Sequence, residues 1–304
     1  MNKELVSIVV VTRNRKRDLD LCLKSLMVQS HKNIEIIVVD NASDKSQKKW
    51  INKKYKNIKV LEASENLGGA GGRNLGIKSV NGKCILFIDD DAYADSKLVS
   101  ELLKTLKKKG VGVVQPKIFD RDKKDVLQGV GHGINLFTGR VFGVGIGEKD
   151  QGQFEKEMEI PMAGCTWMVK KEVIEKIGGY DEDYFIPYED SDFSWRARKS
   201  GYKVMLSPRA IVWHQGSKIT AGHPRLQWLG ITTPDKAFRV SRNKIIFMKK
   251  HAPFINFVVF MILFLPFYNI AHSLIIFSTR RLDVLFNYWR GNLSGLLYIL
   301  IHLT

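Results

Sequence analysis

The chain has 304 residues, 44% of them apolar, and a formal net charge of +17. This length allows one large domain or two modest ones, and the apolar content excludes a chain that is disordered throughout. The basic charge suits anionic partners, but no RNA-recognition or zinc-finger pattern accompanies it, so nucleic-acid binding is not expected. The three cysteines include no CxxC pair and their odd number argues against a disulfide framework, so a reducing compartment fits best. We interpret Cys84 and Cys165 as small buried hydrophobic residues.

Short apolar runs alternate with helix-like segments over the first third of the chain. The pattern predicts strands at 6–11, 34–40, 58–64 and 83–91, and helices at 15–30, 46–55 and 68–80. Strands that alternate with helices form βαβ units and a parallel sheet, in which ligands bind beyond the carboxyl ends of the strands. Polar clusters lie at the C-termini of all four predicted strands, at Thr12-Arg13-Asn14, Asp40-Asn41, Glu65-Asn66 and Asp89-Asp90-Asp91. We therefore expect a binding site at this edge of the sheet.

The pattern changes from about residue 115. Glycines crowd 129–147 and predict hairpins or loops. The following residues predict two strands and two helices, namely a strand at 163–169, a helix at 171–177, a helix at about 189–200 and a strand at 202–206.

A glycine cluster at 66–74 precedes the third predicted helix. It is not a P-loop, because Ile77 and not Lys follows Gly76, and it lacks the third glycine of a Rossmann fingerprint. Backbone N–H groups at a glycine-rich helix start can still approach an anion, and Arg73 adds a charged donor. We expect a phosphate contact here, although a flexible surface loop would explain the glycines alone.

The three consecutive carboxylates of Asp89, Asp90 and Asp91 are best explained by a hard cation. Mg²⁺ and Mn²⁺ prefer oxygen ligands and are commonly held by one or two carboxylates together with substrate phosphates. At the end of a strand, Asp89 and Asp91 can face one side, with Asp90 turned away. Three acids alone would be weak evidence, because acidic helix caps are common.

Two further segments carry candidate chemistry. The acids Glu189, Asp190 and Asp192 begin a predicted helix, where the helix dipole favours them whatever their function; alternatively, one of them is a general base. His214, in the segment 212–217, could be a metal ligand or a structural histidine, and spacing alone does not decide.

The C-terminal region is apolar. Residues 253–277 contain no Asp, Glu, Lys or Arg and are long enough to cross a bilayer, although Pro266, Asn269 and His272 interrupt them. A second apolar stretch at 284–304 carries aromatic and basic residues and predicts an interfacial helix or a weaker span. Basic residues upstream of 253 place the main domain in the cytoplasm by the positive-inside rule. The alternative is a buried helical hairpin in a soluble domain.

Taken in order, the segments VVVTRNR, VVDNASD, NLGGAGGRN, FIDDDA, AGCTWMV, GGYDEDYFIPYEDSDFSWRARKSGY and VWHQGS resemble glycosyltransferase family 2. The resemblance covers about residues 5–217, and 178–202 is especially similar to its rhamnosyl- and galactofuranosyl-transferase branch. It implies the GT-A fold, an α/β domain with a Rossmann-like, mostly parallel central sheet flanked by helices, here followed by membrane-associated helices. It also implies a nucleotide-diphosphate sugar donor, a divalent metal (Mn²⁺ or Mg²⁺) and inversion at the anomeric carbon.

By position, the resemblance also implies site residues. Those at the donor would be Thr12, Arg13, Asp40, Asn66, Arg73, Asp89 and Asp90. The metal ligands would be Asp89, Asp91 and His214. Asp190 matches the catalytic base with Glu189 beside it, and Trp167 lies where related enzymes contact the acceptor.

The sequence therefore predicts an inverting, metal-dependent glycosyltransferase at the cytoplasmic membrane face, acting on a glycan or lipid-linked glycan. Residues 1–115 would form the nucleotide-sugar half of the GT-A domain, 116–235 the acceptor and catalytic half, and 236–304 a membrane-associated helical region. One alternative is a transferase that makes a sugar-phospholipid from polyprenyl phosphate. Another is an inactive membrane subunit that binds nucleotide sugar. The sugar, the acceptor and the oligomeric state are left open.

Overall fold

A computed structural model describes residues 4–215 and 223–302 of the chain. The chain divides into two compact units. Unit 1 comprises Met1–Gly133, Gly143–Phe185 and Glu189–Gly216, and unit 2 comprises Ile134–Phe142, Ile186–Tyr188 and Ser217–Thr304. The last two residues of the 212–217 motif, Gly216 and Ser217, lie outside the described residues.

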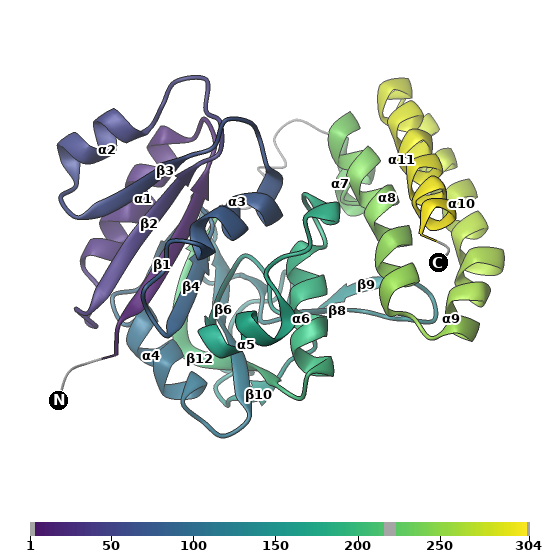
Figure 1. Ribbon diagram of the computed structural model, residues 1–304. Helices are drawn as coiled ribbons and strands as arrows, with labels where there is room; N and C mark the ends of the chain where they lie inside the picture. The colour runs from purple at the N-terminus through teal and green to yellow at the C-terminus, as the bar shows by residue number, and fades with distance from the viewer. Residues whose placement is uncertain (1–3, 216–222, 303–304) are drawn as a thin grey trace. The chain divides into compact units, whose positions relative to one another are not determined.

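Unit 1 is built on a sheet with the order β10-β12-β6-β11-β4-β1-β2-β3. Figure 1 shows its neighbours β4, β1, β2 and β3 side by side. The strands of the sheet are β1 (Val6–Thr12), β2 (Ile34–Asp40), β3 (Ile58–Glu62), β4 (Cys84–Ile88), β6 (Val111–Asp120), β10 (Met158–Glu159), β11 (Thr166–Lys170) and β12 (Lys203–His214). Two short strands attach to it: β5 (Ala92–Ala94) pairs with β12, and β7 (Leu127–Gly129) pairs with β6. The four neighbours from β3 to β4 are parallel, whereas β11 runs antiparallel to both β4 and β6. The predicted α/β fold is confirmed, and the carboxyl ends of β1, β2 and β4 meet at one edge.

Helices cover both faces of this sheet. One face packs against α1 (Lys16–Met27), α2 (Lys48–Lys54) and α4 (Leu98–Leu106), the other against α3 (Gly68–Ile77), α5 (Lys171–Ile177) and α6 (Glu189–Lys199). Because side chains alternate along a strand, Ile8 and Val10 of β1 belong to the first core and Val9 to the second. The strand is buried on both faces, which explains its unbroken apolar run.

The glycines of α3 bring this helix close to β1. A Cβ on Gly72 would lie 2.7 Å from Val11 Cγ1, and one on Gly76 would lie 2.4 Å from Val9 Cγ1. At the start of the helix, the N–H groups of Gly69 and Ala70 donate to the carbonyl of Phe185, at 2.9 and 3.1 Å. Both N–H groups are therefore occupied by protein in this structure, and the phosphate contact expected here stays a prediction. The glycines permit close helix–strand packing, and neighbouring backbone satisfies the helix terminus.

The glycine-rich segment forms a hairpin, as expected. It contains β8 (His132–Ile134) and β9 (Val141–Gly143), which pair as a separate two-stranded sheet. A short 3₁₀ helix, η1 (Glu182–Tyr184), precedes α6.

The described part of unit 2 is mainly helical. It contains α7 (Pro224–Trp228), α8 (Pro234–His251), α9 (Phe254–Val259), the π-helical turn η2 (Phe260–Phe264), α10 (Leu265–Ser278) and α11 (Leu282–Ile301). Helices α8 and α11 pack closely (Figure 1). Ser241 Oγ donates to the carbonyl of Tyr288 at 3.0 Å, and a Cβ on Gly291 would lie 2.2 Å from the carbonyl oxygen of Phe238. A small residue is therefore required at Gly291.

The continuous helical stretch Phe254–Ser278 is long and apolar enough to cross a membrane, with a mean hydropathy of 2.1. Only 17% of its most apolar 18-residue segment is buried. Its polar interruptions face inward, because the Tyr288 hydroxyl donates to Asn269 Oδ1 at 2.9 Å and lies 3.3 Å from His272 Nδ1. The apolar side chains that remain outside follow a helical stripe at Leu263, Phe267, Ile270, Leu274 and Phe277.

Candidate active site

Asp89 and Asp91 face the same histidine. Both follow β4, and His214 is the last residue of β12. In the sheet, β11 and β6 lie between β4 and β12. His214 Nε2 lies 2.9 Å from Asp91 Oδ1 and 3.6 Å from Asp89 Oδ2. Asp90 points elsewhere. It accepts a hydrogen bond of 2.6 Å from Thr12 Oγ1 and lies 3.4 Å from Arg15 Nη1, and burial raises its pKa to about 7.

Gln128 fixes the orientation of the His214 ring. Its Nε2 donates to the backbone carbonyl of His214 at 2.8 Å, so its Oε1 must be the atom that faces His214 Nδ1 at 2.7 Å. Nδ1 therefore carries a proton and donates it to Gln128. The remaining nitrogen, Nε2, points at the two carboxylates, and in the neutral ring it presents a lone pair. A hydrogen-bonded Nδ1–H, with Nε2 directed at other ligand groups, is the usual arrangement of a metal-binding histidine.

The carboxylates of Asp89 and Asp91 lie close to two groups that carry positive charge, Arg15 and protonated His214. Burial alone would raise the pKa of Asp91, but hydrogen bonds from His214 and Arg15, the latter at 2.6 Å, outweigh it and lower the pKa. Burial opposes the charged form of His214, yet Cys165 and the aspartates raise its pKa well above the usual value. Two carboxylates and one imidazole nitrogen form a donor set that fits a divalent cation such as Mn²⁺ or Mg²⁺, which would compete with the second proton of His214.

Arg73 links this group to the start of α6. Its side chain is 8% exposed, and its guanidinium lies 2.9 Å from Asp89 Oδ1, 2.9 Å from Glu189 Oε1 and 3.4 Å from Asp190 Oδ1. The guanidinium of Arg73 is thus paired with three carboxylates, and its predicted position near a diphosphate stays a prediction. Its evident role is to hold three acids from two distant segments at one site.

Asp190 is the most exposed of the three acids at the start of α6. Its Oδ2 accepts from the backbone N–H of Cys165 at 3.2 Å, and its Oδ1 accepts from Trp167 Nε1 at 3.3 Å, while 14% of its side chain remains exposed. Glu189 is more buried, and its pKa is raised by burial and by the charge of Asp190. Asp192 instead pairs with Arg196 at 2.7 Å one turn along the helix, so it has the structural role that the helix dipole suggested.

Trp167 is fully buried. It packs against Phe87, Tyr180 and Phe193, with ring centroids between 4.8 and 5.9 Å apart. This burial is at odds with the acceptor contact predicted for Trp167, because the side chain offers no surface to a substrate. The aromatic cluster uses the indole as a rigid support that donates one hydrogen bond to Asp190.

The other predicted donor residues line the neighbouring strand ends. Asp40 accepts from the backbone N–H groups of Ser43 and Gln47, at 3.1 and 2.7 Å, and so shapes its own loop. Asn66 accepts from the N–H of Gly68 at 3.1 Å and from Asn41 Nδ2 at 3.2 Å. Arg13 is exposed, and its Nε donates to the carbonyl of Ala42.

Sequence reasoning missed three residues of this site. Arg15, Gln128 and Cys165 have no local signal, since each contacts residues that are distant in sequence. Cys165 was expected to be a small buried residue, but it is only partly buried. Its Sγ, Asp89 and His214 offer ligand atoms that all lie within 4.8 Å of one another. Cys84 is buried as expected, Cys22 is buried as well, and all three cysteines are free.

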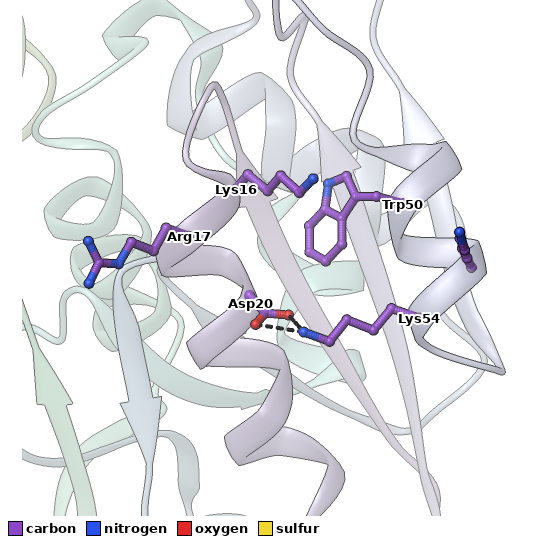
Figure 2. A pocket seen from close by; sticks show the side chains of 6 residues that line it. Lys16, Arg17, Asp20, Trp50 and Lys54 are labelled. Carbon is purple, nitrogen blue, oxygen red and sulfur yellow. Dashed lines mark hydrogen bonds and ion pairs between the residues drawn. The ribbon is translucent and has the colours of Figure 1, made fainter.

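A hollow in unit 1 lies away from these residues. It has a volume of about 720 Å³ and lies between α1 and α2, where it is lined by Lys16, Arg17, Asp20, Trp50, Lys53 and Lys54 (Figure 2). Its only acid, Asp20, is already bound by Lys54 at 2.6 and 2.8 Å. It contains none of the predicted site residues, so size alone does not locate the active site.

Comparison with known proteins decides the family. Residues 7–178, more than half of the chain, match the model of glycosyl transferase family 2. The chain belongs to glycosyltransferase family 2. The resemblance seen in its motifs is confirmed.

Two relatives and one solved structure illustrate the similarity. The chain is 24% identical over 204 residues to the low-salt glycan biosynthesis hexosyltransferase of Haloferax volcanii, which covers 66% of this chain and 63% of that protein. It is 22% identical over 292 residues to the dTDP-rhamnosyl transferase RfbF of Shigella flexneri, covering 92% of this chain and 90% of the relative. The mannosyltransferase PcManGT of Pyrobaculum calidifontis, solved with GDP-Man and Mn²⁺, superposes with a TM-score of 0.59 at 17% identity, covering 96% and 74% of the two chains. This glycosyltransferase therefore has the GT-A fold.

Proposed function

We propose that this family 2 glycosyltransferase is an inverting, metal-dependent enzyme. It moves a hexose or deoxyhexose from a nucleotide-diphosphate donor to a glycan or lipid-linked glycan at the cytoplasmic face of a membrane. One observation carries the proposal: Asp89, Asp91 and His214 converge within 3.6 Å, and Arg73 ties the same site to Asp190. An isolated acidic cluster would serve many purposes, but a metal-ligand set beside a partly open carboxylate is suited to group transfer.

A divalent cation held by Asp89, Asp91 and His214 would supply charge neutralisation for a departing diphosphate. The protein residues prepare for this role. Gln128 keeps Nε2 of His214 directed at the carboxylates, and the ion pair with Arg73 fixes the position of Asp89. Arg15 offers a positive charge at 2.6 Å from Asp91, and its side chain is 48% exposed, so it can turn toward a phosphate.

Asp190 would act as the general base. It takes the proton of the acceptor hydroxyl while that oxygen forms a bond to C1 of the sugar, and the bond from C1 to the diphosphate oxygen breaks on the opposite face. A single displacement of this kind inverts the anomeric carbon and requires no enzyme nucleophile. The hydrogen bonds from Cys165 N and Trp167 Nε1 hold the carboxylate without neutralising it, so it can accept the proton.

The nucleotide would lie along the ends of β1, β2 and β3. Thr12, Asp40 and Asn66 stand there with their loops fixed by hydrogen bonds, and exposed Arg13 can reach the base or ribose. In this assignment residues 1–115 bind the donor and 116–235 complete the acceptor site. The relative that acts on dTDP-rhamnose, which aligns over nearly the whole chain, supports a deoxyhexose among the candidate donors.

Residues 236–304 would hold the enzyme at the membrane. Support comes from the long apolar helical stretch Phe254–Ser278 and from the inward orientation of its polar groups. A membrane-bound catalyst is suited to an acceptor that is itself anchored to lipid.

The test is a screen of sugar nucleotides with the purified full-length chain and Mn²⁺, reading out release of nucleoside diphosphate. We expect turnover of one donor class, which EDTA and the Asp91→Ala variant abolish. The exposed acid Asp125, which pairs with Lys149, is the matched control, and its change to Ala should leave turnover intact. Donor turnover that is equal in Asp91→Ala and wild type would exclude the metal site as the centre of the reaction.

A further inference from the structure

The thiol of Cys165 joins the proposed metal ligands. Cys165 Sγ, a carboxylate oxygen of Asp89 and a ring nitrogen of His214 lie within 4.8 Å of one another. The three residues come from three separate segments: the end of β4, the turn before β11, and the end of β12. Such convergence of one sulfur, one nitrogen and one oxygen ligand differs in kind from the oxygen-rich set formed by Asp89, Asp91 and His214.

Ligand chemistry separates the two sets. Mg²⁺ and Mn²⁺ favour carboxylate oxygens, whereas Zn²⁺, Co²⁺ and Cd²⁺ gain affinity from a thiolate. Zinc sites of protein commonly combine Cys, His and carboxylate ligands, with bond lengths of about 2.0–2.3 Å. These ligand atoms lie within 4.8 Å of one another. Side-chain rotations that move each atom by about 1 Å would bring them to the bond lengths of a tetrahedral ion.

The surroundings of Cys165 fix its backbone and limit how far its side chain can move. Its backbone N–H is held by Asp190 Oδ2 at 3.2 Å, and its φ of +64° lies in the left-handed region that favours glycine. The thiol lies 3.6 Å from Thr166 Oγ1, its neighbour in the chain. The Cα–Cβ bond is thus held by an anchored backbone, and rotation about χ1 moves the sulfur.

We propose that Asp89, Cys165 and His214 form a mixed oxygen, nitrogen and sulfur site that binds Zn²⁺ and other thiophilic divalent ions. When such an ion binds, the thiol proton of Cys165 and any proton on His214 Nε2 pass to solvent, and a sulfur–metal bond forms. Because Asp89 and His214 belong to both sets, the ion excludes Mn²⁺ or Mg²⁺. This consequence rests on the proposed function, whereas zinc binding itself does not.

Cobalt is the probe that reports the sulfur directly. Co²⁺ added to the purified full-length protein should give a thiolate-to-cobalt charge-transfer band in the near ultraviolet, and Zn²⁺ should displace it. Cys165→Ser should lose this band and bind Zn²⁺ on the order of 10–100-fold more weakly. Cys165→Gly relieves the positive φ and should give the same result, which separates loss of the ligand from loss of the fold. Cys84→Ser, a buried thiol away from the site, should keep the band.

Two results would overturn the inference: a wild-type cobalt complex with no thiolate band, or a band that persists in both Cys165 variants. Sugar transfer is measured on the same preparations with Mn²⁺. A thiolate band without any transfer would sink the proposed function and leave the zinc site standing. Transfer that Zn²⁺ inhibits equally in wild type and Cys165→Ser would leave the enzyme and remove the role of sulfur.

Discussion

Asp190 and Asp192 lie two residues apart on α6 but have different partners. Asp190 receives hydrogen bonds from Cys165 and Trp167 and remains 14% exposed, whereas Asp192 is buried against Arg196. If Asp190 is the base, Asp190→Asn should lower the rate of transfer by about 10²–10⁴-fold, because an amide cannot take the proton of the acceptor. The affinity for the donor should stay near that of wild type. Single-turnover rates and donor titrations measure the two quantities separately.

Asp192→Asn is the contrasting variant. It breaks a buried ion pair, so we expect a lower melting temperature and little change in the rate per folded molecule. An Asp190→Asn enzyme that keeps most of its activity would contradict the base and favour a phosphate acceptor, which is already a nucleophile.

At the scale of elements, Asp20 ties α1 to α2 (Figure 2). Burial opposes its charged form, but hydrogen bonds from Lys54, Tyr55 and Lys24 lower its pKa to about 2. A lowered pKa stabilises the fold above the unfolded value of 3.8, and this contribution is lost as the pH falls toward 2. Allowing for solvent screening, Asp20→Asn should cost on the order of 1 kcal/mol at pH 7.

Urea unfolding at several pH values checks this estimate. The difference between Asp20→Asn and wild type should shrink as the pH falls from about 4 toward 2. The exposed pair of Asp125 and Lys149 provides a control, since Asp125→Asn should change the free energy of unfolding by less than about 0.5 kcal/mol. A cost at pH 7 that does not diminish in acid would show that packing and not charge is responsible.

The elements also show what the sequence could predict. The apolar runs of β1, β2 and β4 identified strands correctly because each strand is buried by helices on both faces, and four polar strand ends indicated the edge that carries Asp89 and Asp91. The packing role of the α3 glycines was not foreseen, because it depends on Val9 and Val11 of a strand far away in sequence. Gln128 and Cys165 were missed for the same reason: their significance arises only when three distant segments meet at His214.

At the scale of the whole molecule, the apolar stripe of α10 should decide where the enzyme resides. Phe267 and Leu274 are 63% and 66% exposed, and burying each in lipid is worth about 1.5–3 kcal/mol. Replacing both by Lys should therefore weaken binding to anionic vesicles by about a hundredfold or more. Leu21→Lys with Met27→Lys, two exposed apolar residues of α1, should leave vesicle flotation unchanged. Equal flotation of both pairs would argue against membrane contact through α10.

The proposed function depends above all on a cation that Asp89, Asp91 and His214 would hold beside the diphosphate of the donor. Calorimetry of UDP, GDP and dTDP with the full-length protein, in Mn²⁺ and in EDTA, tests this most directly. We predict that one of these nucleotides binds in Mn²⁺ and loses at least about tenfold in affinity in EDTA, and that folded Asp91→Asn binds it equally weakly in both. Tight binding that is the same with and without metal, and unchanged in Asp91→Asn, would contradict the account.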